Sequence, residues 1–339
     1  MQEKILETSE ELSRVAFGFM ASKAMFAGLH IDLFTHLSHG PGTVDEIATA
    51  TRVPRNRVVT LTTALSSIGV LGYDDGKYVN SPAAEQFLVR DAKYDFGDYL
   101  RYQIDKQMYP FLQQLNEVLD GSLGPEQIDS YAHWMSDADQ ATLYSESQHA
   151  GSLGPGRTLA RTVDLSKAQR LLDVGGGTGA MTISLCKAYP ELSSTIIEFP
   201  NVAEIGWKFV SEADMVNRVS YVPGNALECS WPTEQHAILM SYLLSGVPGQ
   251  SIAELLAWSM ESLEPGGLII IHDFMVESDR RGPPLAALWQ LQHMAFTPDA
   301  QSLSIAWLRE ALTSSGFEIS QSGDLISGMT KLIVGRKPT

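Results

Sequence analysis

The strongest constraint on the fold is a cluster of glycines that directly follows a short apolar segment. Leu171 and Leu172 lead into Asp173, and the cluster comprises Gly175, Gly176, Gly177 and Gly179. A buried strand, a glycine-rich turn and an apolar helix are typical of nucleotide-binding proteins, because glycine lets the backbone approach a ligand and the first helical N–H groups remain free donors. Glu198 ends the next apolar segment, about twenty residues later, where a carboxylate can accept both hydroxyls of a ribose.

The C-terminal half alternates between strand-like and helix-like apolar segments. These segments are residues 171–174, 181–189, 195–198, 202–213, 219–222, 237–244, 251–263 and 268–272. Such alternation predicts an open, mainly parallel α/β sheet of the Rossmann-like class. We assign this domain to residues 151–339 and a separate helical domain to residues 1–150.

The N-terminal half is helical in character. Apolar residues recur at helical spacing between residues 10 and 37 on more than one face, so these helices need a partner to cover them. Thr43 and Glu46 form a capping box, a second helix begins at Pro54, and a hairpin follows around the turn at residues 74–76. This order of elements predicts a winged helix within a dimerisation domain.

The charge of the chain argues against a polyanionic partner. Residues 31–90 contain five basic and six acidic residues, and the whole chain has a formal net charge of −16 at pH 7. Because neutralisation of phosphates dominates binding to nucleic acid, the DNA-binding function of many winged helices is disfavoured, and so is an anionic membrane surface.

The sequence also indicates a compartment and argues against a metal. Cys186 and Cys229, the two cysteines of the chain, have no close spacing, which predicts neither a disulfide framework nor a CxxC metal site. No stretch of about 18 apolar residues suggests a membrane span, and the first residues lack the pattern of a signal peptide. We expect a soluble cytoplasmic protein.

The glycine turn resembles the first motif of class I S-adenosylmethionine methyltransferases. Over roughly residues 10–336 the chain is similar to the dimeric small-molecule O-methyltransferases, which include caffeate, acetylserotonin and hydroxyneurosporene enzymes. The shared features, in family order, are the helical N-terminal module, the glycine turn, Glu198-Phe199-Pro200, Pro265-Gly266-Gly267 and Gly316-Phe317. The resemblance implies S-adenosyl-L-methionine as cofactor, a small-molecule methyl acceptor, and a homodimer with swapped N-terminal helices.

The resemblance also implies roles for individual residues. Residues 173–179 would wrap the methionine part of the cofactor, Glu198 would bind the ribose, Asn225 the adenine amine and Leu227 the adenine ring, with Ser241 completing the set. A dinucleotide such as NAD is the alternative ligand, since NAD-dependent proteins also combine a glycine turn with a later acid. The dimerising module ahead of the turn favours S-adenosylmethionine.

The chain departs from the family at the catalytic positions. Ser245 and Gly246 occupy the places of the family's His-Asp pair, and Asp273 keeps the place of one of the two acids that orient the histidine. The other acid position falls near Ser302. Because a serine hydroxyl has no useful pKa near neutrality, Ser245 could only donate or accept a hydrogen bond. The candidates for a replacement base, in order, are His293, His149 and His272, with Tyr242 and Asp299 as weaker options.

Six residues are expected to line the acceptor pocket. They are Tyr102, Met108, Phe111, Trp289, Met294 and Phe296. Aromatic and thioether side chains suit a flat, apolar acceptor, such as a phenolic, enolic or polyketide-like secondary metabolite. The methylated atom is expected to be oxygen, with carbon or nitrogen as alternatives. The missing histidine leaves three explanations: an acceptor that needs no base because it is already acidic or is a nucleophilic carbon or amine, another base, or a reaction without methyl transfer, as in hydroxylase-like and pericyclase-like relatives.

Overall fold

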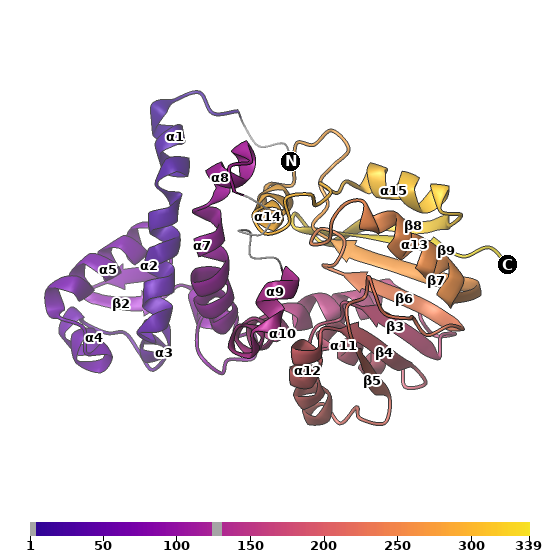
Figure 1. Cartoon of the computed structure of the whole chain (residues 1–339). Coiled ribbons are helices and arrows are strands. Elements are labelled where there is room, and N and C mark those ends of the chain that lie inside the picture. The colour runs from indigo at the N-terminus through magenta and orange to yellow at the C-terminus, as the bar shows by residue number, and fades with distance from the viewer. Residues whose placement is uncertain (1–4, 124–130) are drawn as a thin grey trace. The chain divides into compact units, whose positions relative to one another are not determined.

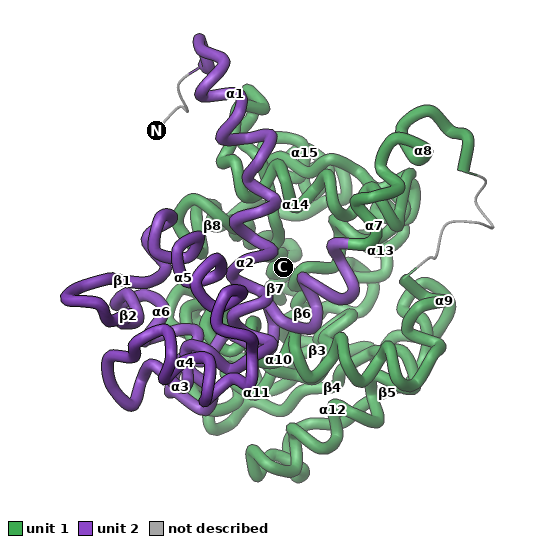
Figure 2. The backbone as a smooth tube through the Cα atoms, turned by 90° about the vertical axis from the view of Figure 1, so that its left-hand side faces the viewer, with its two compact units in different colours: residues 1–3, 110–339 green, residues 4–109 purple. Residues whose placement is uncertain are grey.

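The computed structural model describes residues 5–123 and 131–339. It divides into two compact units, here called the N-terminal unit (Lys4–Tyr109) and the sheet unit (Pro110–Thr339) (Figure 2). The expected boundary at residue 150 falls inside helix α10 (Ala138–Thr162). Because α10 packs against α11 and α12, its helical sequence belongs structurally with the sheet that follows it.

The N-terminal unit consists of helices and one antiparallel strand pair. Its elements are α1 (Ser9–Ala16), α2 (Gly18–His30), α3 (Leu33–Ser38), α4 (Val44–Thr51), α5 (Arg55–Ser67), β1 (Leu71–Asp74), β2 (Lys77–Asn80), α6 (Pro82–Phe87) and the π-helix η1 (Tyr99–Met108). Thr43 and Glu46 form the predicted capping box of α4, and two helices followed by a hairpin occur in the predicted order. Phe26, Leu33 and Leu65 lie in the core, whereas α1 has no buried residue.

The sheet unit alternates helices and strands, as predicted. Its helices are α7 (Tyr109–Leu112, which begins at the boundary), α8 (Leu115–Asp120), α9 (Tyr131–Ser136), α10, α11 (Ala180–Ala188), α12 (Pro200–Glu212), α13 (Ser251–Ser262), α14 (Pro284–Met294) and α15 (Ile305–Ser314). Its strands are β3 (Arg170–Val174), β4 (Ser193–Glu198), β5 (Val219–Pro223), β6 (Gln235–Ser241), β7 (Leu263–Asp273), β8 (Glu318–Ile326) and β9 (Thr330–Arg336). No helix in the described part of the chain is long and apolar enough to span a membrane.

The strands form one sheet between two layers of helices (Figure 1). One apolar core joins the sheet to α10, α11 and α12, and a second core joins the opposite face to α13 and α15. Both faces of the central strands are therefore buried, which explains their continuous apolar sequences. The cores include Leu171 and Leu239 on one face and Leu172 and Ile238 on the other.

The strand order of the sheet is β5-β4-β3-β6-β7-β9-β8. The order in which the chain adds neighbouring strands reverses between β3 and β6, although these two strands are parallel. The chain runs outward from β3 to β5, and then returns to place β6 on the other side of β3, with parallel pairing throughout this part. Ligands of open α/β sheets bind at the carboxyl ends of the strands beside such a reversal. The glycine turn follows β3 at this point.

Candidate functional site

The glycine turn requires glycine for two different physical reasons. Gly177 has φ 55°, a left-handed conformation that side chains disfavour, and a Cβ atom added there would meet no atom within 4 Å. Gly176 has no room for a side chain, because an added Cβ would lie 2.6 Å from Cγ of Asp173. The turn is therefore packed on its inner side and open at Gly177, where a ligand can reach the backbone.

Two carboxyl groups lie beside this turn. Asp173 is fully buried, and its Oδ2 accepts a hydrogen bond from Oγ1 of Thr182 at 2.7 Å, while Oδ1 has no partner among the described residues. Burial raises the pKa of Asp173 to about 7, and the nearby charge of Glu198 acts in the same direction. A positively charged ligand would favour the ionised form of both groups.

Glu198 ends β4 and caps the turn. Its Oε2 accepts from the N–H of Gly177 at 2.8 Å, and its Oε1 accepts from the N–H of Phe199 at 2.7 Å. Burial raises the pKa of Glu198, although these two hydrogen bonds favour the carboxylate. Glu198, the residue predicted to bind the ribose, therefore lies at the carboxyl edge of the sheet, where it binds the glycine turn.

Tyr221 and His149 support the turn from outside. The Tyr221 hydroxyl donates to the carbonyl of Gly177 at 3.0 Å. His149, on α10, hydrogen-bonds through Nδ1 to Oγ1 of Thr178 at 2.8 Å and stacks on Phe209, with ring centroids 3.8 Å apart. Burial lowers the pKa of His149 to about 4, so its ring is neutral at pH 7. The sequence did not single out Tyr221 or Phe209.

The predicted adenine residues follow β5. Asn225 accepts from the N–H of Leu227 through Oδ1 at 3.0 Å, and its Nδ2 donates to Oε1 of Glu228 at 2.8 Å. The Asn225 side chain therefore shapes the loop that carries Leu227, and its amide is oriented by Glu228.

Ser241 is the half-buried end of a polar chain across three strands. Its Oγ lies 2.9 Å from Nδ1 of His272, whose Nε2 lies 2.9 Å from Oγ1 of Thr330. Burial lowers the pKa of His272 to about 3, and both ring nitrogens are occupied. His272 thus joins β6, β7 and β9, and the neutral ring has no free nitrogen for an acceptor. Of the weaker candidates, Tyr242 contacts His272, while Asp299 is exposed.

Ser245 and Asp273 are brought together, as the resemblance implied. Ser245 donates to Asp273 twice, from Oγ to Oδ1 at 2.6 Å and from its N–H to Oδ2 at 3.0 Å. The N–H of Phe274 also donates to Oδ1, at 2.8 Å. Burial raises the pKa of Asp273 to about 6 against these hydrogen bonds. Both residues are buried, so the pair fixes the loop after β6.

Aromatic side chains form a continuous band from the end of β6 to α10. Neighbouring ring centroids along it lie between 4.7 and 6.4 Å apart. This aromatic band comprises Tyr242, Phe274, Trp289, His293, Phe296, Phe111, Tyr131, Trp134 and Tyr144. Phe111, Trp289 and Phe296 were predicted as pocket residues.

Three further pocket predictions lie outside the band. Met294 is half-buried at the end of α14. Tyr102 and Met108 lie on η1 of the N-terminal unit, where Met108 is buried. Phe274, Tyr131, Trp134 and Tyr144 were not predicted as site residues. The density of aromatic residues between 99 and 144 was the signal for the last three, and Phe274 had none.

Other features of the described chain do not offer a competing site. A hollow of about 260 Å³ is lined by Arg170, Ser193 and Gln235 among others, at the amino ends of the strands, opposite the glycine turn. Its edge lacks the free helix N-terminus and the paired carboxyl groups. Within the described residues, no group of three or more His, Cys, Asp or Glu side chains is arranged to hold a metal ion.

The fold and the glycine turn define a class I methyltransferase. The structure aligns with human N-acetylserotonin methyltransferase in complex with SAM at a TM-score of 0.86 and 21% identity, covering 100% of both chains. It aligns with the SAM-dependent methyltransferase SibL at a TM-score of 0.78 and 26% identity, covering 98% of this chain and 100% of SibL.

Sequence comparison defines the family within that class. A model of the O-methyltransferase domain matches residues 122–318, and a model of the O-methyltransferase dimerisation domain matches residues 13–90. The chain belongs to the O-methyltransferase family, and it is an S-adenosylmethionine-dependent methyltransferase. This confirms the predicted cofactor and does not favour a non-methylating reaction.

Two relatives show the chemistry found among similar sequences. A 3-hydroxy-5-methyl-1-naphthoate 3-O-methyltransferase of Streptomyces sahachiroi is 26% identical over 303 residues, which are 88% of each chain. A tetracenomycin polyketide synthesis 8-O-methyl transferase of Streptomyces glaucescens is 24% identical over 332 residues, 97% of this chain and 96% of the relative.

Proposed function

We propose that this protein transfers the methyl group of S-adenosylmethionine to a small aromatic, polyketide-like molecule. The observation that carries the proposal is the aromatic band of the sheet unit, which begins at the same strand edge as the glycine turn. Aromatic rings bind flat apolar molecules by stacking and edge contacts. The naphthoate and tetracenomycin enzymes described above support this acceptor class.

The residues at the carboxyl edge fit the cofactor. The open backbone at Gly177 and the unpartnered Oδ1 of Asp173 suit the methionine part, with its positively charged ammonium group. Glu198 would exchange the Gly177 amide for ribose hydroxyls, and Asn225 would face the adenine amine. The bound cofactor supplies an electrophilic methyl group on a positively charged sulfur. The protein binds and orients both reactants and excludes water.

Calorimetric titration and a turnover assay test this function. We expect S-adenosylhomocysteine to bind the purified protein, because the site is complementary to its charged methionine part. With S-adenosylmethionine and a panel of hydroxylated naphthalenes and anthraquinones, S-adenosylhomocysteine should accumulate together with a methylated product, detected by mass spectrometry. Binding without any methylated product would contradict methyl transfer to this acceptor class. Absence of binding would contradict the cofactor site itself.

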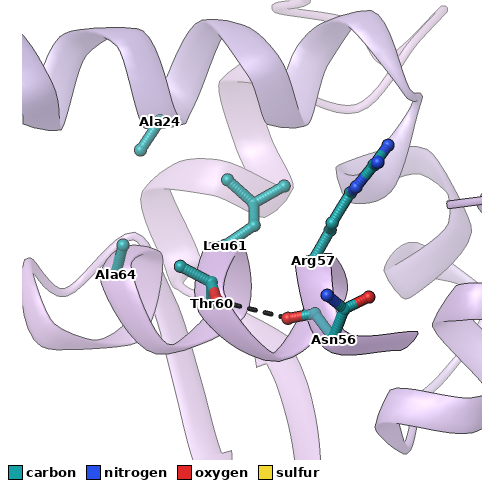
Figure 3. Close-up of a pocket in the computed structure, with 6 residues that line it drawn as sticks. All are labelled: Ala24, Asn56, Arg57, Thr60, Leu61 and Ala64. Carbon is teal, nitrogen blue, oxygen red and sulfur yellow. Dashed lines mark hydrogen bonds between the residues drawn. The ribbon is translucent and has the colours of Figure 1, made fainter. Parts of the chain in front are cut away.

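The N-terminal unit supports a homodimer. Helix α1 has no buried residue, and its apolar side chains are exposed, including Leu12 (61%) and Val15 (70%). A hollow of about 370 Å³ lies between α2 and α5 of the same unit (Figure 3). It is lined by Ala24, Asn56, Arg57, Thr60, Leu61 and Ala64. We infer that a second copy of this chain covers these surfaces, which agrees with the match to a dimerisation domain.

Charge on α1 should dissociate the dimer. The wild-type chain of 37.1 kDa should elute with twice that mass in size-exclusion chromatography with light scattering. Leu12→Glu/Val15→Glu should elute as a monomer, because two carboxylates would be desolvated in the interface. The matched control is Leu119→Glu on α8, since Leu119 is 62% exposed and Leu12 is 61% exposed. A wild-type monomer, or a dimeric double variant, would contradict the inference.

A further inference from the structure

His293 presents a buried nitrogen without a partner. The side chain lies on α14, the residue is 8% exposed, and Nδ1 has no hydrogen-bond partner among the described residues. The backbone of Ser245 lies beside the ring and favours its protonated form, against the effect of burial. In the neutral tautomer that carries its hydrogen on Nε2, Nδ1 has a free lone pair.

The His293 ring lies within the aromatic band. The ring centroid of His293 lies 5.5 Å from that of Phe296, 6.2 Å from that of Phe274 and 6.3 Å from that of Trp289, each in an edge-on arrangement. An unpaired buried acceptor is destabilising, so its presence among apolar rings requires an explanation. A hydroxyl group on a bound aromatic molecule would satisfy it.

Ser245 lies beside His293 and is held in place by Asp273. Asp273 accepts from both the N–H and the Oγ–H of Ser245, which fixes the backbone of the loop after β6. That backbone favours the protonated form of His293. The serine at the family's histidine position therefore lies next to a histidine that comes from a different helix, α14.

We propose that Nδ1 of His293 accepts the hydroxyl proton of the methyl acceptor, and that the acceptor is a phenol or enol on a flat ring. This inference rests on the proposed function. A lone pair of the acceptor oxygen forms the new bond to the methyl carbon, the bond between carbon and sulfur breaks with its electrons remaining on sulfur, and the proton moves from oxygen to Nδ1.

The charge balance of this step suits a buried imidazole. Burial lowers the pKa of His293 to about 4, so the ring is neutral and able to accept a proton at pH 7. In this one step the sulfur loses its positive charge and the imidazole gains one. The total charge within the site is unchanged, so no additional buried charge has to be stabilised.

Two variants and two acceptors of different acidity test the proposal. His293→Gln and His293→Phe both remove Nδ1, and glutamine keeps a polar group on α14. With 1-naphthol, kcat should fall about 100-fold in both variants, the range lost with a general base. With 4-nitro-1-naphthol, which is largely ionised before it binds, the loss should stay below about 10-fold, since no proton needs to be removed.

The controls separate this role from a structural one. S-adenosylhomocysteine affinity should change less than about 3-fold in both variants, because the glycine turn, Glu198 and Asn225 are unchanged. His39→Gln, the same substitution at an exposed histidine of the N-terminal unit, should leave both rates unchanged. Equal losses with both naphthols, or an unchanged kcat, would overturn the proposal. A protein that binds S-adenosylhomocysteine but methylates no phenol or naphthol would overturn the acceptor class. Absence of that binding would overturn the proposed function.

Discussion

Replacing Gly177 with valine is expected to weaken S-adenosylhomocysteine binding by at least about 100-fold while the protein stays folded. Gly177 has φ 55°, so a β-branched residue there carries a backbone cost of about 1–2 kcal/mol. Its side chain would project into open space, where we place the methionine part of the cofactor. Calorimetry measures the affinity, and thermal unfolding verifies the fold.

A matched glycine separates strain from obstruction. Gly328 lies between β8 and β9 with φ 72°, and an added Cβ would likewise meet no atom within 4 Å. Gly328→Val should show a similar loss of thermal stability with unchanged S-adenosylhomocysteine affinity. If both variants lost affinity equally, the open side of the glycine turn would not be the cofactor site.

Replacing Asp273 with alanine is expected to lower the free energy of unfolding by about 3–6 kcal/mol, because three buried donors lose their acceptor at once. These donors are the N–H and Oγ–H of Ser245 and the N–H of Phe274. Urea denaturation at a fixed pH measures the change. Methyl transfer should fall as well, since the Ser245 backbone beside His293 loses its support.

Two milder variants provide a comparison for the loss of unfolding free energy in Asp273→Ala. Asp273→Asn can keep an oxygen toward the N–H of Ser245, but its NH₂ group then faces the N–H of Phe274, so one hydrogen bond is lost. Ser245→Ala removes only the hydroxyl donor. Both should cost about 1–2 kcal/mol. A loss in Asp273→Ala no larger than in Ser245→Ala would contradict the role of Asp273 as a shared acceptor.

The grouping of the candidate cofactor residues at one edge of the sheet was predictable because its signals are local in sequence. Asp173, Glu198 and Asn225 each lie at or just after the carboxyl end of an apolar strand, and parallel strands bring these ends to one edge. Gly177 was identified by the residue type that such a turn needs. These predictions required the strand order alone, which the alternation of segments and the family resemblance supplied.

The acceptor side depended on tertiary packing that has no local signal. Tyr131 and Trp134 are three residues apart on α9, a spacing equally expected of ordinary core residues, and they meet Phe296 and Tyr144 only through the fold. The position of His293 beside the Ser245 backbone likewise depends on residues that are far apart in sequence. The helical sequence pattern of α10 did not indicate that this helix belongs to the sheet unit.

The hydrogen bond between Glu198 and Gly177 has a consequence for affinity in the proposed cofactor site. The carboxylate of Glu198 accepts from the amide of the turn at 2.8 Å. In the proposed arrangement, ribose hydroxyls compete with that amide for the same carboxylate, so their binding yields only the difference between two hydrogen bonds. Such a site is suited to exchange of spent cofactor for fresh cofactor rather than to tight retention of either.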